Sequence, residues 1–179
     1  GQIWNAAEPA RSLGISESSV RRYLDLLSGS YLVRQLQPWH ENIGKRQVKA
    51  PKLYWRDSGL LHQLLGIDQR NALLAHPKCG ASWEGFVMEE LIRGLEPDEV
   101  FFWATHTGAE LDELFVRQGR RLGIEIKRAD APQLTPSMRH ALADLKLDLL
   151  WVIYPGNRSY TLHDKVQVLP LHEALAFAA

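Results

Sequence analysis

The stretch "GIEIKRAD" at residues 123–130 places Glu125 and Lys127 on either side of Ile126. In a β-strand, successive side chains point to opposite faces, so Glu125 and Lys127 share one face and the two isoleucines share the other. A carboxylate and an ammonium on one face of an apolar strand form either a surface ion pair or half of a metal-dependent catalytic site. The surrounding sequence must decide between these two interpretations.

The segments around this stretch predict a helix, three strands, a helix and a strand. An amphipathic helix is expected over 82–95, with Ser82 as its N-cap and Trp83, Phe86, Val87, Leu91 and Ile92 facing a core. Strands are expected at residues 100–106, 110–118 and 121–128, then a helix at 135–146 and an apolar strand at 149–155. A hairpin-like pair and a terminal helix complete the chain. The order αβββαβ predicts an α/β (α+β) domain with a central mixed sheet.

Asp112 lies in the middle of the expected strand at 110–118, one strand before Glu125 and Lys127. The turn "RQGRR" joins the two strands, so antiparallel pairing would bring the three side chains together. Unpaired burial of these charges would be costly, and a metal ion or a phosphate group would remove that cost. Magnesium prefers carboxylate oxygens and retains several water molecules. The spacing therefore favours a Mg²⁺ site for phosphodiester hydrolysis, with Glu84 on the preceding helix close enough to assist.

The first part of the chain predicts a winged helix. Helical patterns at 4–13 and 15–27 flank Gly14, with Asn5 and Ser16 as N-caps. Two strands are expected at 31–39 and 52–57, and a loop that contains glycine and basic residues joins them. A short helix capped by Ser58 should follow, and residues 67–81 are expected to connect the two domains.

Basic residues of this winged helix suggest contact with DNA. The second helix carries four polar residues opposite Val20 and Leu24, and the loop between the strands carries three basic residues that could contact phosphates. The candidate DNA-binding residues are Ser18, Ser19, Arg21, Arg22, Lys45, Arg46 and Lys49. The alternative is that the winged helix is a joint between proteins, with a basic surface that only keeps it in solution.

Charge is unevenly distributed although the 179-residue chain is neutral overall. Residues 1–79 carry 11 Lys/Arg and 6 Asp/Glu, and residues 80–179 carry 10 and 15, which sum to 21 and 21. A basic half could face a polyanion and an acidic half could hold a divalent cation. No apolar run approaches the roughly 20 residues of a membrane span. The single cysteine, Cys79, is compatible with a cytoplasmic protein.

An acidic residue on one strand followed by Glu-x-Lys on the next resembles the restriction-endonuclease-like superfamily, often written PD-(D/E)xK. The resemblance implies that Asp112 and Glu125 are metal ligands and that Lys127 places the attacking water. Glu84 corresponds to the acidic residue that some members carry on the first helix. In this family an apolar residue commonly follows the strand's Asp, whereas Glu113 follows here, so we expect an edge strand or a local irregularity. The following helix also lacks the Gln-x-x-x-Tyr pattern of many active members.

Two longer strings resemble the C-terminal region of a bacterial and archaeal family of predicted AAA-plus ATPases. They are "NIGKRQVKAPKLYWRDSGLLHQLLGI" at 42–67 and "HPKCGASWEGFVMEEL" at 76–91. The resemblance implies an ATPase domain upstream of Gly1 in a longer polypeptide. The phosphate-binding pattern G-x-x-x-x-G-K-[ST] is absent from the sequence, so ATP is expected to bind only through that upstream domain.

These observations predict a winged helix over 1–70 and a restriction-endonuclease-like domain over 78–179. The expected function is that of a DNA-associated module of an AAA-plus ATPase with a Mg²⁺-dependent endonuclease-like site. The alternative is a non-catalytic module with a degenerate nuclease fold that contacts a partner protein, DNA or a second copy of itself. Expected partners are DNA and the upstream ATPase domain, with homo-oligomerisation open, in a cytoplasmic protein that does not engage a membrane.

Overall fold

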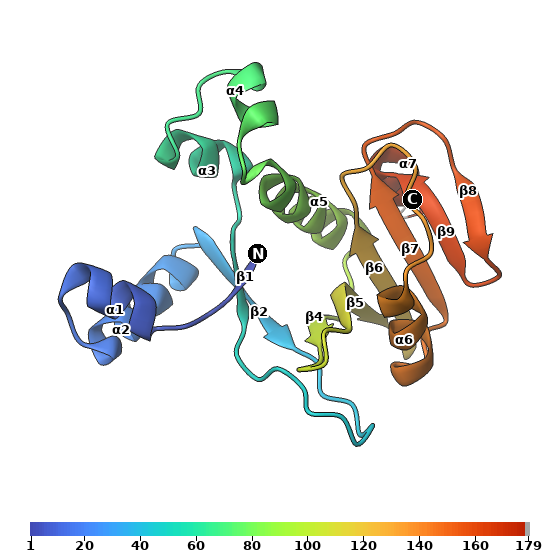
Figure 1. Ribbon diagram of the computed structural model, residues 1–179, viewed down its shortest axis with the longest axis horizontal. Helices are drawn as coiled ribbons and strands as arrows, with labels where there is room; N and C mark the ends of the chain where they lie inside the picture. The colour runs from blue at the N-terminus through green and yellow to red at the C-terminus, as the bar shows by residue number, and fades with distance from the viewer. Residues whose placement is uncertain (178–179) are drawn as a thin grey trace. The chain divides into compact units, whose positions relative to one another are not determined.

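The computed structural model describes residues 1–177, which fold as two compact units (Figure 1). The first unit contains Gly1–Leu36 and Ala50–Gly85, and the second contains Gln37–Lys49 and the chain from Phe86 onward. The chain therefore passes from one unit to the other three times. No local pattern in the sequence indicates that residues 37–49 belong with the second unit. The boundaries predicted at residues 70 and 78 stay predictions.

Two helices open the first unit. Helix α1 (Ala7–Leu13) ends at Gly14, whose φ of 64° lies in the left-handed region that glycine adopts without strain. Helix α2 (Glu17–Gly29) begins after Ser16, whose hydroxyl accepts a hydrogen bond from the Ser19 N–H at 3.1 Å. The predicted pair of helices around Gly14 and the predicted Ser16 cap are therefore present. The more specific assignment as a winged helix stays a prediction.

Three short strands and two helices complete the first unit. The strands β1 (Gln2–Ile3), β3 (Lys52–Trp55) and β2 (Val33–Pro38) pair antiparallel in that order. Helices α3 (Ser58–Leu64) and α4 (Arg70–Ala75) follow. Two predictions were wrong here. Asp57, not Ser58, caps α3, by accepting a hydrogen bond from the Leu60 N–H at 2.7 Å, and the expected connector at 67–81 contains α4.

Helix α5 (Cys79–Leu95) begins three residues before the predicted cap at Ser82, which lies within the helix. Its buried face follows the predicted spacing at Val87 and Leu91, both of which are completely buried. Phe86, expected in the core, is 40% exposed. None of the helices in residues 1–177 combines the length and apolar character that a membrane crossing requires.

A mixed sheet forms the centre of the second unit. Its antiparallel part consists of β4 (Glu99–Ala104), β5 (Glu110–Arg117) and β6 (Arg120–Ile126). Helix α6 (Pro136–Asp144) leads to β7 (Leu149–Tyr154), which runs parallel to β6. The strand β9 (Val166–Pro170) lies parallel to β7, the edge strand β8 (Tyr160–His163) pairs antiparallel with β9, and α7 (Leu171–Ala176) follows. The predicted mixed α/β architecture is confirmed.

A β-bulge interrupts β5 at Asp112 and Glu113. Phe101 pairs with Leu114 and Trp103 pairs with Leu111, so two residues of β5 lie opposite the single residue Phe102. Because β5 has β4 on one side and β6 on the other, it is not an edge strand. Of the two expectations that Glu113 raised, the local irregularity is present and the edge position is wrong. Bulges of this kind redirect side chains and recur beside active sites.

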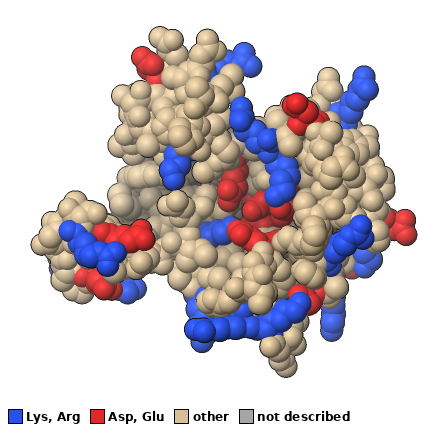
Figure 2. Space-filling model, in the orientation of Figure 1, with Lys and Arg blue, Asp and Glu red and all other residues tan. Residues whose placement is uncertain are grey.

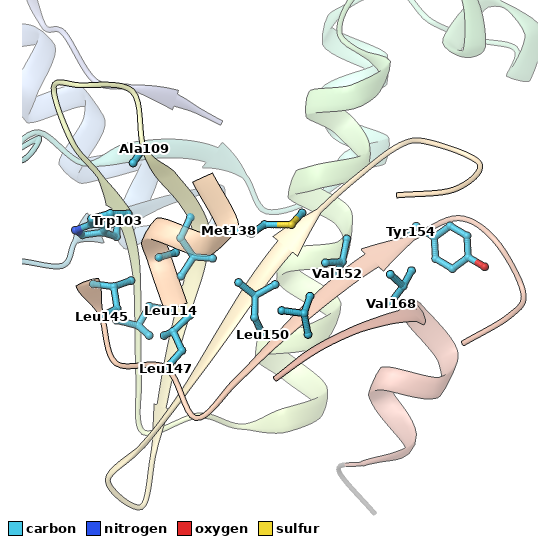
Figure 3. Packing of buried hydrophobic residues seen from close by; sticks show 13 residues of the cluster. Trp103, Ala109, Leu114, Met138, Leu145, Leu147, Leu150, Val152, Tyr154 and Val168 are labelled. Carbon is cyan, nitrogen blue, oxygen red and sulfur yellow. The ribbon is translucent and has the colours of Figure 1, made fainter. Parts of the chain in front are cut away.

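The core between α6 and the sheet is apolar and closely packed (Figure 3). Met138 and Leu145 of the helix region lie against Leu114 of β5 and Leu150 of β7, and all four are completely buried. Gly123 of β6 permits this approach, since a Cβ atom there would lie 2.5 Å from a methyl carbon of Leu147. The face of β6 that carries Gly123 is therefore the face that α6 covers.

Candidate metal and phosphodiester site

Asp112 is held at the point where the ladder between β5 and β6 ends. The first pair of this ladder is Arg117 with Arg120, and the last is Glu113 with Ile124. One residue further along, Asp112 lies opposite Glu125. The backbone N–H of Ile126 donates a hydrogen bond of 2.8 Å to Asp112 Oδ2. The Asp112 carboxylate thus takes the place that a backbone carbonyl occupies in a continuing ladder, and it is fixed beside the last residues of β6.

Glu125 and Lys127 form an ion pair on the adjacent strand. Lys127 Nζ lies 2.5 Å from Glu125 Oε1, with 7% of the Glu125 side chain exposed and 38% of the Lys127 side chain exposed. The backbone N–H of Lys127 donates to the carbonyl of Ile153 at 2.9 Å, which anchors the end of β6 against β7. The carboxylate is therefore deep in the unit, while the ammonium reaches toward solvent.

Acidic neighbours keep Lys127 protonated. Burial by itself lowers the pKa of an ammonium, but the charge and hydrogen bond of Glu125 and the charges of Asp112 and Glu110 outweigh it, so the pKa of Lys127 is raised above its ordinary value. The structure thus brings Asp112, Glu125 and Lys127 into one electrostatic cluster, and it adds Glu110, which sequence reasoning missed. Glu110 starts the same strand as Asp112, two residues earlier, so period-two alternation could have indicated it.

This cluster can offer a magnesium ion two carboxylate ligands. Within residues 1–177, no three His, Cys, Asp or Glu side chains come together in a metal-binding arrangement. Magnesium is commonly bound through one or two carboxylates, with water completing its octahedron. Asp112 and Glu125 are the residues that would hold the ion, and Glu125 would have to share its oxygens with Lys127.

Glu84 lies in the first unit, near the start of α5, and its carboxylate is engaged there. The Tyr54 hydroxyl of β3 donates a hydrogen bond of 2.6 Å to Glu84 Oε1. A role for Glu84 beside Asp112 and Glu125 stays a prediction. Tyr54 carries no sequence signal beyond its place in an alternating strand, so this partner could not be inferred beforehand.

Two of the four predicted DNA-binding residues of α2 are engaged in the helix's own cap. The hydroxyls of Ser18 and Ser19 lie 2.8 Å and 2.9 Å from Ser16 Oγ, and Arg21 pairs with Glu17 at 3.4 Å, while Arg22 is exposed. Figure 2 shows basic and acidic side chains beside each other over α1 and α2. The two helices contain three arginines (Arg11, Arg21 and Arg22) and three acids (Glu8, Glu17 and Asp25), so their net charge is zero.

The three basic loop residues lie in the 37–49 segment of the second unit. Lys45 pairs with Asp144 at 2.5 Å, whereas Arg46 and Lys49 are exposed. The segment is anchored on β4 because the Trp103 indole N–H donates to Gln47 Oε1 at 2.9 Å and the His106 N–H donates to the Arg46 carbonyl at 2.9 Å. The structure thus presents Arg46 and Lys49 to solvent on a fixed loop.

An apolar pocket of about 270 Å³ lies in the first unit and was not predicted. Side chains of α1, α2, β2 and β3 line it, among them Leu13 and Tyr23, which are 65% and 51% exposed. Leu26 and Tyr31, at the end of α2 and just beyond it, are 61% and 75% exposed. Tyr23 and Leu27 lie at helical spacing from the buried Val20 and Leu24, yet both are exposed.

Comparison with known proteins places two family models on the chain. A model described as "Domain of unknown function (DUF8612)" matches residues 1–71, and one described as "Domain of unknown function (DUF4143)" matches residues 79–174. Two curated relatives are each 50% identical over 175 residues: "Uncharacterized protein Rv2008c" of Mycobacterium tuberculosis and "Uncharacterized protein Mb2031c" of Mycobacterium bovis. The alignment covers 98% of this chain and 40% of each relative. No solved structure matches the chain.

Proposed function

Because the chain belongs to the DUF4143 family, whose description assigns no activity, we propose a function from the geometry of its site: Mg²⁺-dependent hydrolysis of phosphodiester bonds in DNA, in a module of a longer protein. The observation that carries the proposal is the cluster at the end of β5 and β6. There, Asp112 accepts the Ile126 N–H, and Glu125 pairs with Lys127 on the neighbouring strand. Association with an AAA-plus ATPase, which the sequence resemblance suggests, is part of the same proposal.

Each residue of the cluster has a distinct role in this proposal. A bound Mg²⁺ would supply positive charge at the scissile phosphate and acidify a bound water. Asp112 and Glu125 hold the ion, and the hydrogen bond from Ile126 fixes the orientation of Asp112. Lys127, which forms an ion pair with Glu125, would act as a cation that donates hydrogen bonds to a phosphate oxygen or to the attacking water.

Contact with DNA rests on exposed basic side chains of both units. Arg46 and Lys49 on the anchored loop, and Arg22 on α2, are exposed. Contacts of this kind are with phosphates, are independent of sequence and weaken steeply with salt. We expect anisotropy of a labelled duplex to detect binding at low salt, and neutralising Lys45, Arg46 and Lys49 together to weaken it. Unchanged affinity in that triple variant would remove the loop from the proposal.

A plasmid-nicking assay tests the catalytic step. Supercoiled plasmid is incubated with the protein and Mg²⁺ or Mn²⁺, and Lys127→Ala and Asp112→Asn are compared with Lys78→Ala, which removes an exposed lysine of the first unit. The first two variants should lose activity by roughly 10²-fold or more, as loss of a positioned charge at a transition state does, and the third should be unchanged. Equal cleavage by Lys127→Ala, or no cleavage together with no Mn²⁺ binding, would disprove the catalytic proposal.

A second candidate function is a non-catalytic interaction module, and the apolar surface of the first unit favours it. Exposed apolar patches of this kind are typical of protein interfaces. In this case Glu125 and Lys127 are a structural ion pair that takes no metal. Self-association is the most direct test: the molar mass from light scattering should rise with protein concentration, and Leu26→Asp should abolish the rise while Leu74→Asp, at another exposed leucine, should not.

A further inference from the structure

A second cavity, of about 370 Å³, lies in the second unit at the turn between β5 and β6. Its apolar lining comes from the end of α5, β5, β6, β7 and the residue after α7, and includes Phe115, Leu122 and Trp151. Its polar lining comes from Arg117, Gln118 and Arg120 at the turn. Volumes of roughly 300–1,000 Å³ with an apolar lining and a few polar groups are typical of small-molecule sites.

The turn places two arginines directly opposite each other. Arg117 and Arg120 are direct partners in the β5–β6 ladder, and the two residues between them, Gln118 and Gly119, have φ values of 50° and 75°. This two-residue turn with positive φ at both positions fixes the register. Like charges directly opposite each other across a ladder are unfavourable. Neither arginine forms an ion pair with a side chain in residues 1–177, whereas the neighbouring Arg121 pairs with Glu41 at 2.6 Å.

One wall of the cavity is aromatic. Trp151, which lines the cavity, is 6% exposed and packs against Phe177, with ring centroids 5.1 Å apart. Phe177 lines the cavity as well, so the two rings together offer a flat apolar surface.

This cavity is separate from the cluster of Asp112, Glu125 and Lys127. Arg117 is five residues beyond Asp112 on β5, which corresponds to about 17 Å of strand. Leu122, which lines the cavity, immediately precedes Gly123, so it lies on the face of β6 opposite to the one that α6 covers. A function of this cavity therefore does not depend on the proposed phosphodiester hydrolysis.

We propose that this cavity binds a small organic anion whose phosphate or carboxylate lies between Arg117 and Arg120 and whose ring lies against Trp151 and Phe177. The anion relieves the repulsion of the opposed guanidiniums, which are well suited to planar or tetrahedral oxyanions. The concave aromatic lining accommodates a ring. A bare inorganic ion would make no use of this lining.

Calorimetric titration of the full chain tests this proposal with four probes: adenosine 5′-monophosphate, adenosine, inorganic phosphate and benzoate. The phosphate-bearing ring should bind more tightly than adenosine or inorganic phosphate. Benzoate distinguishes the two anion types, since binding comparable to the nucleotide identifies a carboxylate site and weaker binding identifies a phosphate site. Equal binding of adenosine and the monophosphate, or no binding of any probe, would overturn the proposal.

Variants locate the binding. The double variant Arg117→Gln, Arg120→Gln should bind adenosine 5′-monophosphate about tenfold more weakly or worse, as expected for the loss of hydrogen bonds to a charged group. Arg139→Gln, at an exposed arginine of α6, should leave this binding unchanged. A loss as large in Arg139→Gln as in the double variant would contradict the assignment. Because both turn arginines are exposed, circular dichroism should show the double variant folded.

Discussion

At the scale of single residues, Glu125 controls the protonation of Lys127. The carboxylate supplies both a charge and a hydrogen bond that offset the burial of the ammonium. In Glu125→Gln the burial remains and the charge is lost, so the pKa of Lys127 should fall. Titration of the lysine ¹³Cε resonance in metal-free buffer measures this shift. Glu173→Gln, on α7, is the control, and an unchanged Lys127 titration in Glu125→Gln would contradict the ion pair.

Glu41 should make folding stability depend on acid pH. Burial works against its charged form, but hydrogen bonds from Trp39 and Arg121 and the charges of Arg121 and Lys146 lower its pKa below the ordinary value of 4.5. As pH falls, the unfolded carboxyl takes up a proton before the folded one does. The stabilisation is therefore complete above the unfolded pKa and is lost as pH falls through the folded pKa. Urea unfolding of the wild type should lose more stability than Glu41→Gln across this range, and parallel pH profiles would refute the effect.

Strand alternation predicted which residues of β6 share a face, and the structure places Glu125 and Lys127 in contact as that pattern requires. It also places Asp112 beside β6, through the Ile126 N–H. The hydrogen bond from Tyr54 to Glu84 had no comparable signal, because it joins residues 30 positions apart in a strand and a helix. The spacing of residues along a strand or helix predicts which side chains share a face. It does not predict which other element packs against that face.

At the scale of secondary structure, the N-cap of α3 provides a direct comparison of neighbouring residues. Asp57 accepts the Leu60 N–H, whereas Ser58 is the first residue of the helix. Asp57→Ala should therefore lower the free energy of unfolding by about 1 kcal/mol, the usual cost of a lost cap. Ser58→Ala should change it by less than about 0.5 kcal/mol, because Ser58 is only partly buried and does not cap the helix. Thermal melts of both variants give the answer, and a larger effect at Ser58 would contradict the observed cap.

Local signals predicted α1, α2 and the strands other than β1 well, because glycines, caps and alternation act over a few residues. They failed where tertiary context decides. Glu113 indicated a local irregularity in β5, but the residue opposite it, Phe102, is known only from the pairing of β4 with β5. Helix α4 is short and none of its residues is buried, so it left no apolar stripe in the sequence.

At the scale of the whole molecule, the second unit should not be fully stable without residues 37–49. Trp39 packs edge-on against Phe101 at 5.0 Å between ring centroids, and Gln47 accepts the Trp103 indole N–H. A fragment of residues 79–177 loses these contacts and uncovers one side of β4. We expect it to melt at a lower temperature than the full chain, and a synthetic peptide of residues 37–49 should raise its melting temperature. The prediction would be contradicted if the fragment melted at the temperature of the full chain and the peptide did not change that temperature.

The membership of residues 37–49 in the second unit has a consequence for biosynthesis. On the ribosome this segment is made about 50 residues before β4, and at 5–20 residues per second the interval is on the order of several seconds. During that time Trp39 has no Phe101 to pack against, and the segment's backbone has no strand with which to pair. The nascent chain thus exposes Trp39 and the unpaired backbone of residues 37–49 until β4 emerges.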